Sequence, residues 1–239
     1  MNEWKQRTAL LLGETNINKL QQSRILVVGV GGVGAYAAEM LVRAGVGHMT
    51  IIDSDRVAQS NINRQLIAMH STVGEVKVDV LAQRLLDINP TLHLSVRHEY
   101  LEVEAVATLM QESYDYVVDA IDTIAPKVAL LSHCLQHDIA VVSSMGAGAR
   151  RNPSLIQYAD IADTYRCGLA RAVRSRLRKM GVKKRLPVVF TPEEPLTHAI
   201  QEIEGERNKR TTVGTISYMP AIFGCYLAAH VINKLTDHD

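Results

Sequence analysis

Residues 24–34 read RILVVGVGGVG, a run of aliphatic side chains that passes directly into a glycine-rich segment. The aliphatic half is typical of a strand buried in a parallel sheet, and residues 33–44 continue with helical spacing. Glycines between a strand and a helix allow a tight turn, and they let backbone N–H groups approach a phosphate at the helix N-terminus. The stretch therefore predicts a nucleotide-binding loop, whose glycines are Gly29, Gly31, Gly32 and Gly34.

Strand and helix patterns alternate along the chain as far as Ser144. Apolar runs predict strands at residues 49–52, 92–96, 114–118 and 140–143, and helical periodicity predicts helices at 76–88 and 125–137. Strands that alternate with crossover helices form mostly parallel, doubly wound sheets. We therefore expect an α/β protein with a Rossmann-type sheet.

The chain after residue 144 is less regular, and we expect it to extend the same domain. The predicted division of the single domain, residues 1–239, is a nucleotide-binding core at 1–144 and a substrate-side extension at 145–239. The elements expected in the extension are strands at 155–161 and 186–190, a basic helix at 169–180, a mobile loop at 192–210 and an apolar helix at 219–235.

Composition excludes several classes of protein. A chain of 239 residues can bury a core that needs no disulfide support. Cys134, Cys167 and Cys225 stand far apart with no C-x-x-C pair, which argues against a zinc ribbon and suits a reducing compartment. The N-terminus has no signal-peptide pattern, and the apolar stretch 218–232 is too short to span a bilayer. We expect a cytoplasmic protein that does not enter the membrane.

The formal net charge of +1 conceals a basic segment. Residues 166–185 contain nine Lys or Arg residues and no acidic residue, so the remainder of the chain is net negative. Such asymmetry indicates a polyanionic partner, and a solvated helix face is the alternative interpretation.

An acidic residue follows the glycine loop at the distance typical of a ribose ligand. Asp53 ends the strand 49–52, which completes a fingerprint shared by NAD, FAD and ATP sites. Arg64 and Lys77 come next, and a triphosphate under attack needs such cations because negative charge grows on the leaving group. The guanidinium of Arg64 is suited to a bidentate contact with phosphate, and the ammonium of Lys77 is suited to act as a point charge beside it. The polar residues that accompany them are Asp55, Ser60, Asn61, Asn63 and Gln65.

A second acidic pair, Asp119 and Asp122, follows the strand expected at 114–118. The carboxyl ends of parallel strands meet on the ligand side of a doubly wound sheet. A carboxylate there can hold Mg²⁺ that bridges phosphate oxygens, and Asp122 is the candidate metal ligand. The alternative is that Asp122 caps the helix that begins near residue 125.

These motifs together resemble those of the ubiquitin-activating-enzyme-like adenylyltransferases, which include the molybdopterin- and thiamine-pathway activators. The matching features are G-x-G-G-x-G, D-x-D, S-N-x-x-R-Q, the following Lys and D-x-x-D, in order over residues 24–122. The resemblance implies transfer of AMP from ATP to a carboxylate, with catalytic roles for Arg64, Lys77 and Asp122. It also implies a homodimer in which Arg7 reaches the partner's triphosphate.

Within this family the chain looks most like the tRNA threonylcarbamoyladenosine dehydratases, through residues 7–13, 144–149, 188–191 and 214–220. That similarity implies adenylation of the carboxylate of a modified adenosine in tRNA, followed by cyclisation that expels AMP. The basic residues that would contact tRNA are Arg171, Arg174, Arg178, Lys183 and Lys184. Paired zinc cysteines and a thioester cysteine, which protein-activating relatives carry, are missing from the sequence.

Two other functions remain open at this stage. Activation of a sulfur-carrier or ubiquitin-like protein uses the same ATP chemistry, but gains nothing from a polybasic helix. An NAD-binding oxidoreductase accounts for the glycine loop and Asp53, but leaves Arg64, Lys77 and Asp122 without a role. The segment 146–148 is interpreted as a turn, with a backbone site for Na⁺ or K⁺ as the alternative. The sequence also leaves open a sulfur-relay protein partner.

Overall fold

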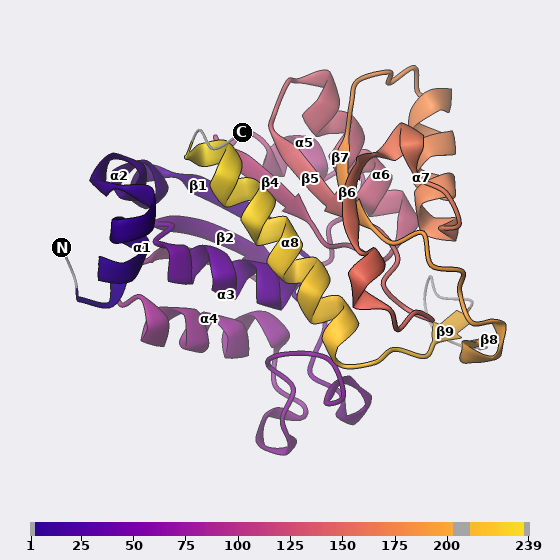
Figure 1. Ribbon diagram of the computed structural model, residues 1–239, viewed down its shortest axis with the longest axis horizontal. Helices are drawn as coiled ribbons and strands as arrows, with labels where there is room; N and C mark the ends of the chain where they lie inside the picture. Colours follow the sequence, from indigo (N-terminus) through magenta and orange to yellow (C-terminus); the bar gives the residue numbers. More distant parts are fainter. Residues whose placement is uncertain (1–2, 203–210, 237–239) are drawn as a thin grey trace.

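The protein forms a seven-stranded sheet in a computed structural model that describes residues 3–202 and 211–236. The strand order is β3-β2-β1-β4-β5-β7-β6, and every neighbouring pair is parallel except β6 and β7 (Figure 1). The strands are β1 (Arg24–Val28), β2 (His48–Ile52), β3 (His93–Arg97), β4 (Tyr116–Asp119), β5 (Val141–Ser144), β6 (Gln157–Asp160) and β7 (Pro187–Phe190). The predicted mostly parallel, doubly wound sheet is confirmed.

Helices cover both faces of the sheet, as the continuous apolar strands require. Ile25 and Val27 of β1 pack in one cluster with α3, α4 and α8, whereas Leu26 and Val28 pack in a second cluster with α5, α6 and α7. The helices are α1 (Gln6–Leu12), α2 (Glu14–Gln22), α3 (Gly34–Ala44), α4 (Lys77–Ile88), α5 (Val106–Leu109), α6 (Ile124–Gln136), α7 (Gly168–Lys179) and α8 (Tyr218–Leu235).

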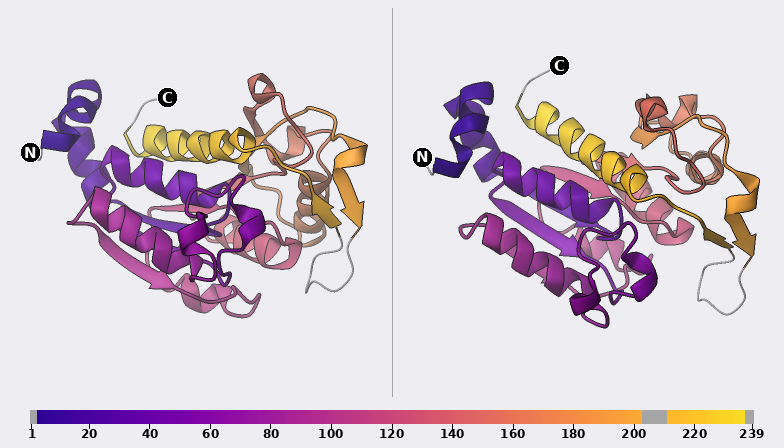
Figure 2. Two further views of the ribbon diagram at one scale, coloured as in Figure 1. Left: turned by 90° about the horizontal axis from the view of Figure 1, so that it is seen from below. Right: turned by 60° about the horizontal axis from the view of Figure 1, so that its bottom comes forward.

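The C-terminal helix α8 lies directly on α3, the helix that follows the glycine loop (Figure 2). The contact depends on Gly224, because a Cβ there would lie 2.4 Å from the carbonyl oxygen of Val33. The same packing brings Pro220 to 3.1 Å from where a Cβ of Gly32 would lie. A helix that begins only at Tyr218 therefore forms one wall of the glycine loop.

The expected elements agree with the structure except in the C-terminal portion and at the N-terminus. The predicted strand 155–161 is shorter, because a 3₁₀ turn at Pro153–Leu155 precedes β6. The predicted loop 192–210 is wrong at its centre. A 3₁₀ turn, Thr197–Ala199, leads there into β8 (Ile200–Glu202), which pairs with β9 (Thr211–Val213). Residues 203–210 lie outside the described part.

Backbone contacts that local sequence does not encode fix this hairpin. Gly214 N–H donates to Ala199 O at 2.7 Å, and Ala149 N–H donates to Gly214 O at 2.8 Å.

The helices α1 and α2 at the N-terminus are not predicted from the sequence pattern. Among the described residues no helix combines the length and apolar character that crossing a bilayer requires.

Candidate active site

The glycine loop lies where the strand order reverses, between β1 and β4. Ligands of doubly wound sheets bind in the crevice at such a point, beyond the carboxyl ends of the strands. Gly29 has a φ of +86°, and a Cβ there would lie 2.8 Å from Ala120 O in the loop that follows β4. At Gly34 a Cβ would lie 1.7 Å from Gly29 O. The loops after β1 and β4 are therefore in direct contact, and glycine is required at both positions.

Asp53 joins the end of β2 to this loop. Its carboxylate accepts hydrogen bonds from Val30 N–H and Asp55 N–H, each at 2.8 Å. Burial raises the pKa of Asp53, and the nearby charge of Lys77 opposes that shift. Lys77 itself is 5% exposed and pairs with Asp55 at 2.7 Å. The acid predicted to bind ribose and the cation predicted to bind phosphate thus belong to one charged cluster beside the loop.

Gln65 is a buried polar side chain beside the glycine loop. Its side chain is 9% exposed, and its Nε2 lies 3.7 Å from where a Cβ of Gly31 would be. Within the described residues its Oε1 has no hydrogen-bond partner, although a buried acceptor normally has one. A hydroxyl or amino group of a nucleotide seated on the glycine loop would satisfy this oxygen. Asn61, also predicted, is buried, and its Oδ1 accepts from Ala58 N–H at 3.1 Å.

Arg64 lies on the same side of the loop. Its carbonyl oxygen is 3.4 Å from where a Cβ of Gly32 would be. Its guanidinium donates to Ser60 O and to Asn63 Oδ1, each at 2.8 Å, and Asn63 donates in turn to Thr215 O at 2.9 Å. The Ser60–Gln65 motif therefore contacts both the glycine loop and the segment that leads into α8.

The two aspartates after β4 have different environments. Asp119 is fully buried, whereas Asp122 is exposed at the C-terminal edge of the sheet. The N-cap position of α6 is Thr123, which makes no side-chain capping bond, and Asp122 is the residue before it. No group of three His, Cys, Asp or Glu side chains in the described part could hold a metal alone. One exposed carboxylate together with phosphate oxygens is nonetheless the usual donor set for Mg²⁺.

The buried partner of Asp119 is Lys127, which sequence reasoning missed. Its Nζ lies 2.7 Å from Asp119 Oδ2, and neither side chain is exposed. The available signal was a lysine in the otherwise apolar start of α6, IAPKVALL. A lysine on the buried side of a helix requires a partner, because an unpaired buried charge is very costly.

The comparisons with known proteins agree with this geometry. The sequence profile of the ThiF family matches residues 5–239. The chain belongs to the ThiF family. The tRNA threonylcarbamoyladenosine dehydratase of Bacillus subtilis is 37% identical over 96% of this chain and 93% of its own length. That of Escherichia coli is 36% identical over 97% and 94%.

A solved structure of the Escherichia coli dehydratase TcdA in complex with ATP superimposes with a TM-score of 0.90. It is 35% identical and covers 99% of this chain and 96% of its own. The resemblance inferred from the motifs, including its dehydratase branch, is confirmed. These relatives match the chain over nearly its whole length, including the less regular portion after residue 144.

In the C-terminal portion of this ThiF-family fold, one arginine bonds to three segments. Arg150 is 6% exposed, and its Nη1 donates to the carbonyls of Gly146 and Gly148 at 2.9 and 3.1 Å. Its other nitrogens donate to Glu193 O and Arg166 O at 3.1 and 2.9 Å. The two glycine carbonyls considered for Na⁺ or K⁺ thus already face a guanidinium. Sequence reasoning missed Arg150, because a basic residue in a loop gives no local signal.

The predicted tRNA contacts on and after α7 fall into two groups. Arg171, Arg178 and Lys183 are exposed. Arg174 is half-buried, and its Nη1 donates to Ile161 O, Thr164 O and Thr164 Oγ1. Lys184 is also exposed, but it pairs with Asp138 at 2.5 Å. Two surface depressions of about 450 and 410 Å³ are both lined by Arg174 and Arg178.

Arg7 does not lie in the site of its own chain. It is exposed on α1, and the neighbouring Lys5 lies against Gly45, which ends α3. The glycine loop is at the other end of α3, an 11-residue helix roughly 16 Å long.

Proposed function

We propose that this chain is an ATP-dependent tRNA threonylcarbamoyladenosine dehydratase. The observation that carries the proposal is that Asp53, Arg64 and Lys77 gather around one glycine loop. Asp122 belongs to the loop after β4, which packs against the glycine loop. Cations and an exposed carboxylate beside a phosphate loop suit phosphoryl chemistry, and a dinucleotide oxidoreductase has no use for them. The dehydratases that match the chain over nearly its whole length supply the substrate class.

In the first step, an oxygen of the substrate carboxylate attacks the α-phosphorus of ATP, and pyrophosphate leaves. The glycine loop, Asp53 and Gln65 seat the nucleoside half. Arg64 and Lys77 stabilise the charge that develops on the departing phosphates. Bound Mg²⁺, held by Asp122, would neutralise phosphate oxygens. No strong general base is needed, because a carboxylate is already ionised at neutral pH.

In the second step, a nitrogen or oxygen of the substrate attacks its own activated carbonyl carbon. AMP leaves with the former carboxylate oxygen, and the nucleophile loses its proton, so the nucleoside loses one water overall. Because the ring closes within one molecule, the enzyme needs no cysteine nucleophile. This fits the buried positions of Cys134 and Cys167 and the pKa of about 12 to which burial raises the Cys134 thiol.

The deciding experiment is incubation of the purified protein with ATP, Mg²⁺ and tRNA that carries threonylcarbamoyladenosine. We expect mass spectrometry of the digested nucleosides to show loss of one water, with AMP and pyrophosphate formed in equal amounts. NAD in place of ATP is the control. ATP turnover with an unchanged nucleoside, together with adenylation of a carrier protein ending in Gly-Gly, would favour the carrier-activating alternative.

The exposed cations on and after α7 are proposed to contact tRNA phosphates in the cytoplasm. We expect the triple variant Arg171→Gln, Arg178→Gln and Lys183→Gln to bind tRNA more weakly. The slope of log affinity against log salt should fall by about 2 to 3, since each phosphate contact contributes about 0.7–0.9. The matched control, at the other end of the molecule, is Lys19→Gln, Arg24→Gln and Arg43→Gln. Equal slopes for the two triples would contradict this assignment.

We propose that two copies form a homodimer in which Arg7 completes the partner's site, because Arg7 cannot reach its own. Arg7→Ala and Arg64→Ala are then each expected to be inactive, but a mixture allowed to exchange subunits should recover activity. In a two-fold symmetric dimer, random exchange leaves about one quarter of the sites intact. A mixture no more active than its components would show that Arg7 acts elsewhere.

A further inference from the structure

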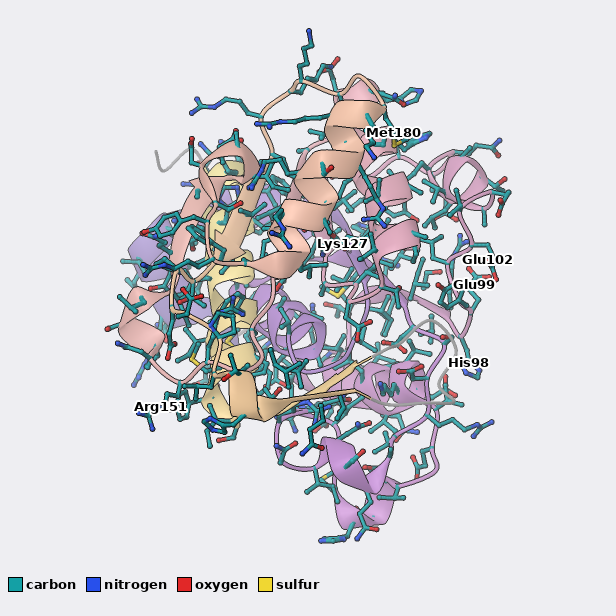
Figure 3. The ribbon with its side chains drawn as sticks, turned by 90° about the vertical axis from the view of Figure 1, so that its right-hand side faces the viewer. His98, Glu99, Glu102, Lys127, Arg151 and Met180 are labelled. Atoms are coloured by element: carbon teal, nitrogen blue, oxygen red, sulfur yellow. The ribbon has the colours of Figure 1, made fainter. Side chains whose placement is uncertain are left out.

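A buried ion pair lies beneath the loop that carries Asp122. Lys127 and Asp119 have no exposed side-chain surface. Lys127, labelled in Figure 3, belongs to α6, which packs against α7. Asp119 ends β4, and Lys127 lies in the first turns of α6. The pair therefore spans the connection between strand and helix, and Asp122 lies within that connection.

The contacts of the pair converge on Ile121, the residue before Asp122. Lys127 Nζ donates to Ile121 O at 3.0 Å, and Ile121 N–H donates to Asp119 Oδ1 at 3.1 Å. The other carboxylate oxygen, Asp119 Oδ2, accepts from Ser143 Oγ of β5 at 2.6 Å. Both polar backbone groups of Ile121 are thus bonded to one charged pair, which β5 anchors in the sheet.

The other side of the connection is fixed by the glycine loop. A Cβ at Gly29 would lie 3.3 Å from Ile121 N and 2.8 Å from Ala120 O. The N-cap residue of helix α6, Thr123, makes no side-chain capping bond. The position of the Asp122 backbone therefore depends on Lys127 and Asp119 below it and on Gly29 beside it.

Stability alone does not account for such a pair. Removing two charges from water is costly, and well-packed apolar residues of similar volume often stabilise a protein as much or more. Groups that hold a metal ligand in place, in contrast, typically change metal affinity 10- to 100-fold when they are removed. We propose that Lys127 is a positioning residue that, through Ile121, holds the Asp122 carboxylate where it binds the divalent cation of the ATP complex. This inference rests on the proposed function.

The test measures Mn²⁺ affinity by electron paramagnetic resonance in the presence of a non-hydrolysable ATP analogue, so that no turnover is needed. Lys127→Met alone leaves Asp119 as an unpaired buried charge, and we expect that variant to be strongly destabilised for this reason alone. The informative variant is the double substitution Asp119→Asn with Lys127→Met. It removes both charges, and an asparagine oxygen can still accept from Ile121 N–H. Lys127→Arg keeps the charge and a donor.

We expect the double variant to melt near the parent temperature but to bind Mn²⁺ about tenfold more weakly. Lys127→Arg should recover most of the affinity. Glu39→Gln removes a different buried carboxylate, which pairs with the exposed Arg84 between α3 and α4, and should leave metal affinity unchanged. Parent affinity in a folded double variant would overturn the role of Lys127. Absence of Mn²⁺–nucleotide binding in the parent would instead refute the proposed function.

Discussion

Replacing Arg64 by alanine is expected to lower ATP–pyrophosphate exchange by about 10²- to 10³-fold, the usual effect of removing a group that stabilises transition-state charge. The reason is that negative charge grows on the leaving pyrophosphate, and the guanidinium can bind two of its oxygens at once. Lys77 is held by Asp55 at 2.7 Å and cannot replace that geometry. The measurement is the initial exchange rate at saturating ATP and Mg²⁺.

Two matched variants separate charge from structure at this position. Arg64→Lys keeps a point charge but loses the bidentate contact, so its rate should lie between those of the parent and the alanine variant. Arg56→Ala removes a nearby arginine whose guanidinium donates to Gly74 O at 3.0 Å, and we expect its rate within about twofold of the parent. Melting curves show whether the loss of the Arg64 bonds to Ser60 and Asn63 unfolds the protein. A well-folded Arg64→Ala variant with near-parent exchange would refute the proposed role.

The local part of this architecture could be predicted from the sequence because it is encoded in consecutive residues. Three features have a period or spacing that is visible in the sequence alone. They are the glycine loop, the acid that follows β2 and the alternation of strand and helix. Their convergence could also be predicted, since parallel strands bring their carboxyl ends to one edge. For this reason Asp53 and the loops after β1 and β4 lie together as expected.

What could not be predicted depends on contacts between distant segments. Arg150 is important because four carbonyls from three separate segments face its guanidinium. The hairpin β8–β9 has only three residues in each strand, and its place is set by hydrogen bonds to Ala149 and Ala199. In the sequence, Arg174 cannot be told apart from the other cations of the basic segment. Its hydrogen bond to Thr164 Oγ1 depends on the folded position of a separate segment.

The largest effect on stability is expected at Gly34, the first residue of α3. In Gly34→Ala the new methyl carbon would lie 1.7 Å from Gly29 O and 3.1 Å from the Cβ of Ala120. Both neighbours belong to the loops that form the nucleotide site, so relief of the clash must separate those loops. Overpacking usually costs about 1–3 kcal/mol, and a collision with backbone should reach or exceed the upper end. For a chain of this size that lowers Tm by roughly 6–12 °C or more.

Gly168 provides the control for the alanine substitution itself. It is likewise the first residue of a helix, α7, but its φ is not positive and nothing lies within 4 Å of where its Cβ would be. Gly168→Ala should therefore melt no lower than the parent, because alanine restricts the unfolded chain without strain. Addition of ATP and Mg²⁺ distinguishes a loss of stability in Gly34→Ala from a loss of ATP binding. At 100 times Kd a ligand adds about 2.7 kcal/mol to a competent site, and that gain should vanish in Gly34→Ala but persist in Gly168→Ala. If Gly34→Ala kept the parent's ATP-induced shift, the loop could not be the phosphate site.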